Sequence, residues 1–192
     1  MFSLPRITRT IIIANVALFI LDSALGGAWS GWLALWPLGS GNFMPWQVLT
    51  YAFVHGSVAH VGFNMLGVYM FGADLERVWG ERRYLTYYLF CAVSAAAVQL
   101  VISAFGANYG PTIGASGAVF GLLLGYARLF PHRMIMPLFP PIPMRAPVFV
   151  VLYGVLELFL GVTGTQAGVA HFAHLGGLAG GFFLMRYWKQ WR

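Results

Sequence analysis

The sequence has few charged residues. Asp, Glu, Lys and Arg make up only 8% of its 192 residues, whereas a soluble domain carries about 25%. Lysine is nearly absent, because Lys189 is the only one. So few charges cannot cover a water-facing surface, and 59% of the residues are hydrophobic, with a mean hydropathy of +0.75. We therefore expect a protein that is embedded in a lipid bilayer.

Cysteine is also scarce. Cys91 is the only one and lies in an apolar run, which excludes a disulfide framework and a thiolate metal site. We expect it to be a small buried hydrophobic residue. The net charge of +6 does not indicate nucleic-acid binding, because the basic residues form no stripe interleaved with aromatic residues. We predict no cofactor, no metal and no nucleic-acid partner.

Long apolar runs are what the sequence has instead. A membrane-spanning helix needs about 20 mostly apolar residues. Six segments qualify, at about 9–27, 56–73, 84–104, 116–130, 147–163 and 170–187. The fourth is short, about 22 Å at helical rise. We predict an all-α, polytopic membrane protein, a bundle of six transmembrane helices that forms a single domain over residues 1–192.

Two features precede the second span. Residues 28–55 are rich in Trp, Gly and Pro, which favours an interfacial loop with short helices in the membrane plane. The first segment has a second interpretation as a cleavable signal peptide, because Arg6 and Arg9 precede an apolar run that ends in small residues. No clean A-x-A site follows, so we expect this segment to be retained as a span.

The basic residues predict the orientation. With six spans, all eleven fall on one side of the bilayer: Arg6, Arg9, Arg77, Arg82, Arg83, Arg128, Arg133, Arg145, Arg186, Lys189 and Arg192. The positive-inside rule then places both termini in the cytoplasm. We expect a multi-pass protein of the bacterial inner (plasma) membrane.

Polar residues at bilayer depth are costly and therefore mark candidate functional sites. The candidates are His55, His60, Asn64, Ser116, Glu157, His171 and His174. Ser116 and His174 each lie 12 residues before an arginine at the inner end of their spans, about 18 Å above it. The same estimate places Asn64 about 19–20 Å up and His60 roughly one turn higher. These residues converge on one layer, about 10 Å below the outer surface.

That layer contains the parts needed for acyl transfer. A serine hydroxyl becomes a nucleophile when a histidine accepts its proton. Ser116 opens a helix, so free backbone N–H groups point at its site, and His60 and Asn64 can add donors for an oxyanion. Small-residue stripes begin beside both candidates, with Gly117, Gly121 and Gly125 on span four and Gly177 and Gly181 on span six. Such stripes let helices approach closely, which would bring Ser116 to His174.

Five elements from Trp46 to Gly181 resemble the rhomboid family of intramembrane serine proteases. They are Trp46 itself, HGSVAHVGFN from His55 to Asn64, GADLERVWG from Gly72 to Gly80, GASG from Gly114 to Gly117, and AHLGG from Ala173 to Gly177. The last two resemble the family's G-x-S-G nucleophile motif and A-H-x-x-G base motif.

The resemblance implies a Ser116–His174 dyad without a catalytic carboxylate. It also implies an oxyanion hole from the Ser116 backbone N–H, His60 and Asn64. The supporting residues are Gly114, Gly117, Phe120, Gly177, His55 and Glu76. Phe120 stands where the family often has a tyrosine that stacks on the histidine. Gln47 stands where an arginine often follows the tryptophan, which we expect to weaken one anchoring contact of the loop.

Three residues leave alternatives open. On chemistry alone, His171, one turn before His174, could be the base, and only the motif and the depth favour His174. Glu76 sits beside Arg77 far from the site, so we expect a structural role. Glu157 lies at the depth of the site and could orient a histidine as a triad acid does, but we favour a hydrogen-bonded group that faces the bundle interior.

The predicted function is hydrolysis of a peptide bond in or near the transmembrane segment of a membrane-protein substrate. We expect the site to open to the outer side and the substrate to reach it laterally, beside span five. Other classes of intramembrane protease do not fit, because H-E-x-x-H and G-x-G-D motifs are missing. Two alternatives are a haem or metal protein ligated by His55 or His60 with His171 or His174, and a catalytically inactive rhomboid-like chaperone. The sequence does not reveal the oligomeric state.

Overall fold

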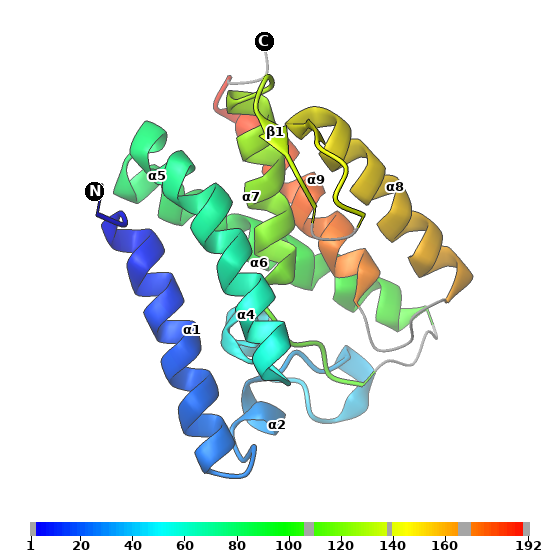
Figure 1. Ribbon diagram of the computed structural model, residues 1–192. Coiled ribbons are helices and arrows are strands. Elements are labelled where there is room, and N and C mark those ends of the chain that lie inside the picture. The colour runs from blue at the N-terminus through cyan, green and yellow to red at the C-terminus, as the bar shows by residue number, and fades with distance from the viewer. Residues whose placement is uncertain (1–2, 106–109, 138–139, 165–169, 190–192) are drawn as a thin grey trace.

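The protein folds as a bundle of helices in a computed structural model that describes residues 3–105, 110–137, 140–164 and 170–189 (Figure 1). One of the basic residues used above, Arg192, lies outside these ranges. The helices are α1 (Arg6–Ala24), α2 (Ser30–Leu33), η1 (Leu38–Ser40), α3 (Gln47–Thr50), η2 (Tyr51–Phe53), α4 (Val58–Gly67), η3 (Val68–Gly72), α5 (Ala73–Trp79), α6 (Glu81–Ala104), α7 (Ser116–Leu129), α8 (Ala146–Thr163) and α9 (His171–Tyr187). Two short strands, β1 (Met134–Ile135) and β2 (Met144–Arg145), pair antiparallel.

Three described helices are long and apolar enough to cross a bilayer by length and composition: α1, α6 and α8. Helix α7 is apolar but shorter, with 14 residues, and α9 has 17. The run from α4 to α5 is continuous over residues 58–79, with a π-helical turn at η3 in its middle. These helices confirm the predicted all-α polytopic bundle and overlap the six predicted ranges.

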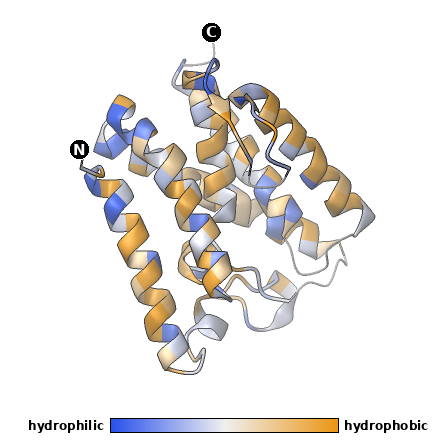
Figure 2. Ribbon diagram, in the orientation of Figure 1, coloured by the Kyte–Doolittle hydropathy of each residue, from blue (hydrophilic) through white to orange (hydrophobic). Residues whose placement is uncertain are grey.

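Burial separates a central helix from two peripheral ones. In α6, 44% of the apolar window is buried, against 22% in α1 and in α8. Figure 1 shows α1 and α8 on opposite sides of the bundle, and Figure 2 shows that both are predominantly hydrophobic. Most of the apolar window of α1 and of α8 is therefore on the surface of the protein. We expect this surface to face lipid.

Small residues let the central helices approach one another. On α9, a Cβ added at Gly177 would collide with the backbone carbonyl of Gly117 on α7. A Cβ at Gly176 would lie 3.0 Å from the backbone of Ala95 on α6. Helix α9 therefore touches α6 and α7 through its backbone, which only glycine permits at these positions.

A buried carboxylate joins α1 to α5. Glu76 accepts hydrogen bonds from the backbone N–H of Ile7 at 2.8 Å and from both the backbone N–H and the hydroxyl of Thr8 at 2.7 Å. The first N–H groups of a helix have no partner within it, and Pro5 offers α1 no side-chain cap. Glu76 supplies that cap from another helix. We call Ile7, Thr8 and Glu76 the Glu76 anchor.

Basic residues from separate segments gather at the same end of the bundle. Asp74 pairs with Arg77 at 2.8 Å and with Arg133 at 3.4 Å. Arg83 lies over the ring of Trp188, 4.4 Å from its centroid, just beyond α9. The start of α1, the α5–α6 junction, the segment before β1 and the end of α9 therefore share one end of the molecule.

The segment between α1 and α4 forms short helices held by Gln47. Its side chain is buried, donates to the carbonyl oxygens of Trp32 and Asn42 at 3.1 Å, and accepts from the N–H groups of Trp36 and Met44 at 3.2 and 3.1 Å. Gln47 binds four backbone groups at once, because an amide both donates and accepts. Our expectation that it weakens one anchoring contact relative to an arginine stays a prediction.

Candidate active site

The chain just before α7 is fixed on three sides, and this positions Ser116. Thr112 exchanges two backbone hydrogen bonds of 2.9 Å with Leu35. Gly114 donates its N–H to the carbonyl of Tyr51 at 3.0 Å, and the N–H of Ala115 points to His55 Nε2 at 3.5 Å. Ser116 is the first residue of α7, so the first-turn N–H groups have no partner within the helix and point at the site.

Gly114 is required by both its backbone and its surroundings. Its φ of +110° is a conformation that residues with a side chain rarely adopt. A Cβ at this position would lie 2.5 Å from Nε2 of His60, so the imidazole packs directly against the glycine backbone. The G-x-S-G pattern therefore has a local cause, namely a left-handed turn covered by a histidine ring.

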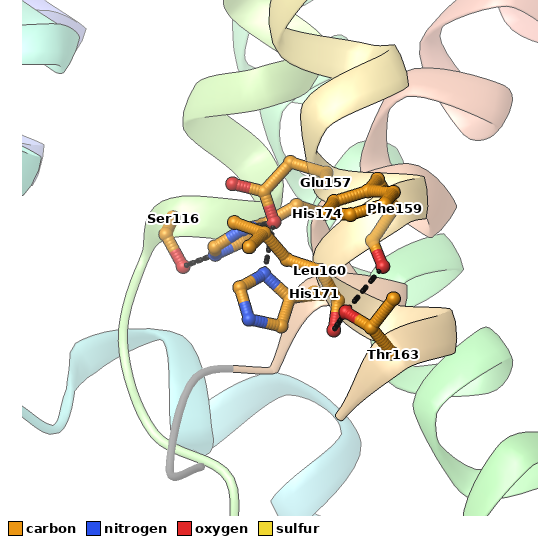
Figure 3. Close-up of polar contacts among 7 residues, drawn as sticks. All are labelled: Ser116, Glu157, Phe159, Leu160, Thr163, His171 and His174. Atoms are coloured by element: carbon orange, nitrogen blue, oxygen red, sulfur yellow. Dashed lines mark hydrogen bonds and ion pairs between the residues drawn. The ribbon is translucent and has the colours of Figure 1, made fainter. Parts of the chain in front are cut away.

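Ser116 and His174 are in direct contact, as Figure 3 shows. Ser116 Oγ lies 2.7 Å from Nε2 of His174, across the interface between α7 and α9. The ring of His174 stacks on Phe120, with centroids 4.5 Å apart and planes 8° from parallel. His174 is buried, so the stacked ring and the packed helices leave its imidazole little freedom to turn.

Glu157 reaches the same histidine from α8. Its Oε2 lies 2.9 Å from Nδ1 of His174 and 2.6 Å from Nδ1 of His171 (Figure 3). The carboxylate, both histidines and Ser116 come from three helices, α7, α8 and α9. We call Ser116, Glu157, His171 and His174 the Glu157 cluster. The structure thus brings together a serine, a histidine and a carboxylate in the order that a catalytic triad requires.

The expectation for Glu157 changes in one respect. We favoured a hydrogen-bonded group that faces the bundle interior, and Glu157 is buried and hydrogen-bonded. Its partners, however, are His171 and His174. The depth estimate was the signal that could have found this contact, because it placed Glu157 level with the site. It could not show which way the side chain turns around the axis of α8.

His60 and Asn64 lie on α4. Besides its contact with Gly114, the His60 ring meets His55 edge-on, with centroids 4.9 Å apart. The amide nitrogen of Asn64 donates to the carbonyl of His60 at 2.8 Å. One of its two N–H groups is therefore used within α4, which leaves the second as a potential donor.

His55 precedes α4 and is mostly buried. A neutral imidazole has one ring nitrogen that can accept a hydrogen bond. The N–H of Ala115 faces Nε2 at 3.5 Å. The His55 ring therefore lies against the turn that leads to Ser116.

One group of side chains among the described residues could hold a metal ion. Glu157, His171 and His174 offer ligand atoms that all lie within 4.8 Å of one another. His55 and His60 form a separate pair and do not belong to this group. The haem or metal ligation that we considered from the sequence, with His55 or His60 beside His171 or His174, stays a prediction that this group does not test.

Comparison with known proteins agrees with the resemblance. A family model described as the Rhomboid domain matches residues 42–190. The chain is similar to the rhomboid protease GluP of Bacillus subtilis (strain 168), with 31% identity over 140 residues, 72% of this chain and 25% of that protein. It is also similar to the rhomboid protease GlpG of Yersinia pestis (strain Pestoides F), with 30% identity over 185 residues, 95% of this chain and 62% of that protein. The chain thus spans less than two thirds of the length of either relative.

Proposed function

The chain belongs to the rhomboid family, and from that premise we propose that it is an intramembrane serine endopeptidase that cleaves transmembrane proteins. Ser116 is the nucleophile and His174 the general base. The observation that carries this proposal is the 2.7 Å contact between Ser116 Oγ and His174 Nε2 at the start of a helix. A hydrogen-bonded serine and histidine is the arrangement that activates a hydroxyl for acyl transfer.

The geometry supports a two-step reaction. Ser116 Oγ attacks the substrate carbonyl carbon while its proton moves to Nε2 of His174. The tetrahedral oxyanion is bound by the backbone N–H of Ser116, with His60 and Asn64 as further donors. Collapse of the intermediate breaks the peptide bond, and His174 gives the proton to the leaving amine. Water then attacks the acyl ester, with His174 again as base, and regenerates Ser116.

The substrate reaches this site from the bilayer. The proposed route lies beside α8, which is peripheral and exposes apolar side chains such as Val155 and Phe159. A transmembrane helix must unwind there to expose its carbonyl, so helix-weakening small residues near the cut are expected. Disulfide cross-linking of α4 to α8 should stop cleavage, and cleavage that survives the cross-link would contradict this route.

The orientation follows from the cluster of basic residues at one end of the bundle. We propose that this end is cytoplasmic, since Lys and Arg are enriched in cytoplasmic loops. Both termini then face the cytoplasm, and the catalytic site opens to the outer side of a bacterial plasma membrane. Cysteines placed at Gly39 and at Lys189 should react with a membrane-impermeant maleimide from the outside and from the inside, respectively.

The decisive experiment is cleavage of a model single-span substrate in proteoliposomes. The variants Ser116→Ala and His174→Ala should each lose activity by about 10³-fold or more, because residues that act as a unit are each indispensable. His171→Ala should keep substantial activity. Normal cleavage by Ser116→Ala would refute the serine mechanism. No cleavage by the wild-type protein would instead favour the interpretation as a catalytically inactive rhomboid-like chaperone.

A second candidate function rests on the three ligand atoms of Glu157, His171 and His174. Two imidazoles and a carboxylate can coordinate a transition metal. Metal analysis of the purified protein distinguishes the two functions. A stoichiometric metal whose removal abolishes the protein's activity would favour a metal site, whereas full cleavage in the presence of EDTA supports the serine mechanism.

A further inference from the structure

Glu157 presents one oxygen to two imidazoles. Oε2 lies 2.9 Å from Nδ1 of His174 and 2.6 Å from Nδ1 of His171, and all three side chains are buried. An ionised carboxylate only accepts hydrogen bonds, so both Nδ1 atoms must carry a proton to satisfy this geometry. A protonated carboxyl group could donate to only one of them. The contacts are therefore best satisfied by a carboxylate that holds two Nδ1–H tautomers.

The tautomer of His174 decides whether Ser116 can be activated. With the proton on Nδ1, Nε2 carries a lone pair and can accept the hydroxyl proton of Ser116 over the observed 2.7 Å. With the proton on Nε2, the same contact leaves no acceptor for the serine. When His174 takes up the serine proton it becomes an imidazolium, and an adjacent negative charge stabilises it most where water is excluded.

His171 fixes the carboxylate in turn. It donates to the same Oε2, at the shorter of the two distances, from a position one turn before His174 on α9. Its Nε2 is buried and has no hydrogen-bond partner among the described residues, so its contact with Glu157 is the polar one that orients the ring. Phe120 completes the support, because it stacks on the face of His174. The base is thus held by a carboxylate at Nδ1 and an aromatic ring on one face.

We propose that Glu157 is a positioning residue for the catalytic base, with His171 as its second donor, so that this chain uses a Ser116–His174–Glu157 triad. This inference rests on the proposed function of Ser116 and His174. It departs from the dyad without a carboxylate that the family resemblance implies. Glu157 does not touch the substrate in this arrangement and acts only through His174.

The test compares Glu157→Gln with the wild-type protein on the model single-span substrate. A glutamine amide can donate to Nδ1 of His174 and then favours the tautomer with the proton on Nε2. We expect kcat to fall by about 10²- to 10⁴-fold, the range in which a correctly placed general base contributes. The acidic limb of the kcat–pH profile should move to lower pH, because the negative charge that favours the imidazolium is gone. His171→Ala should lose about tenfold or less, since Glu157 still reaches His174.

The matched control is Glu76→Gln, which changes the other buried glutamate among the described residues. It should leave the acidic limb where it is, because Glu76 binds no histidine. A limb that moves equally in both variants would indicate a general structural effect and overturn the proposal. So would a Glu157→Gln variant whose kcat stays within threefold of wild type and whose acidic limb does not move.

A second measurement uses the wild-type protein, so its result does not depend on whether a variant folds. The ¹⁵N shifts of the His174 ring in the wild-type protein should report a proton on Nδ1 and a free Nε2 at a pH where the enzyme is active. A proton on Nε2 would overturn the role of Glu157. Cleavage by Ser116→Ala is the separate result that would refute the serine mechanism of the proposed function, so the two failures are distinguishable.

Discussion

Two glutamates are buried among the residues that the structure describes, and they have different partners. Glu76 is 4% exposed and Glu157 is 8% exposed, and each accepts hydrogen bonds from groups on another helix. The donors to Glu76 are two backbone N–H groups and a threonine hydroxyl, none of which changes charge near neutral pH. The donors to Glu157 are two imidazoles, a side-chain type that can both take up and release a proton.

This difference separates a structural carboxylate from one linked to catalysis. Glu76 compensates a helix start that has no other cap, so its contribution is a fixed contact between α1 and α5. Glu157 binds groups whose protonation changes during the proposed reaction. Burial and hydrogen bonding do not distinguish the two residues, whereas the chemistry of their partners does. Changes to the Glu76 anchor should therefore alter stability alone, and changes to the Glu157 cluster should alter activity.

Among substitutions outside the Glu157 cluster, the largest effect is expected at the contact between α7 and α9 that supports it. In Gly177→Ala, the added Cβ meets the carbonyl of Gly117 and must push α9 away from α7. A displacement of about 1 Å between reacting groups can cost about 10²-fold in rate, so kcat should fall by about that factor. Gly62→Ala is the control, since no atom lies within 4 Å of its Cβ. Equal activities of the two variants would show that the α7–α9 contact does not position Ser116.

Removal of the other carboxylate should affect stability. Glu76→Ala leaves the N–H groups of Ile7 and Thr8 without their acceptor, which should lower the free energy of unfolding by about 1–3 kcal/mol. Thermal unfolding in detergent micelles measures the loss. The kcat–pH profile of the protein that stays folded should match that of the wild type. A shifted kcat–pH profile would mean that Glu76, like Glu157, influences the catalytic histidine.

A smaller change to the same anchor sharpens the assignment. Thr8→Val deletes the hydroxyl that donates to Glu76 and keeps the backbone donor of the same residue. The expected loss is about 1 kcal/mol, the net value of one hydrogen bond. Thr10→Val is the matched control, because its hydroxyl bonds to the carbonyl of Arg6 within α1. If both variants unfold at the same temperature, the hydroxyl of Thr8 contributes nothing specific to the anchor.

The smallest effect should come from Phe120→Tyr. The ring stacks on His174 at 4.5 Å, and a hydroxyl added at its edge leaves the stacked faces unchanged. We expect kcat to stay within about threefold of wild type, since a stacked pair contributes about 0.5–1.5 kcal/mol through its faces. Phe120→Ala removes the face and should cost more. If Phe120→Tyr lost more activity than Phe120→Ala, the ring would act through its edge and not through its face.

The sequence alone was sufficient for the membrane class, the all-α architecture and the pairing of Ser116 with His174. Hydropathy identifies the membrane-spanning segments. The number of residues from the end of a segment then gives the position along the helix, because each residue adds about 1.5 Å. The sequence also placed Glu157 at the depth of the site. It could not determine the direction of that side chain, since lipid and protein interior are both apolar and leave little amphipathic signal to set the rotation of a membrane helix.

Only the tertiary structure decided which polar groups meet. Glu157 and His171 come together because α8 and α9 pack with these faces toward each other. Gln47 became an anchor because the loop between α1 and α4 turns four backbone groups toward its amide. Composition indicated that the protein lies in a membrane, and spacing predicted a common depth for its candidate site residues. The contacts between helices determined the partners of those residues, and with them the support of the proposed catalytic base.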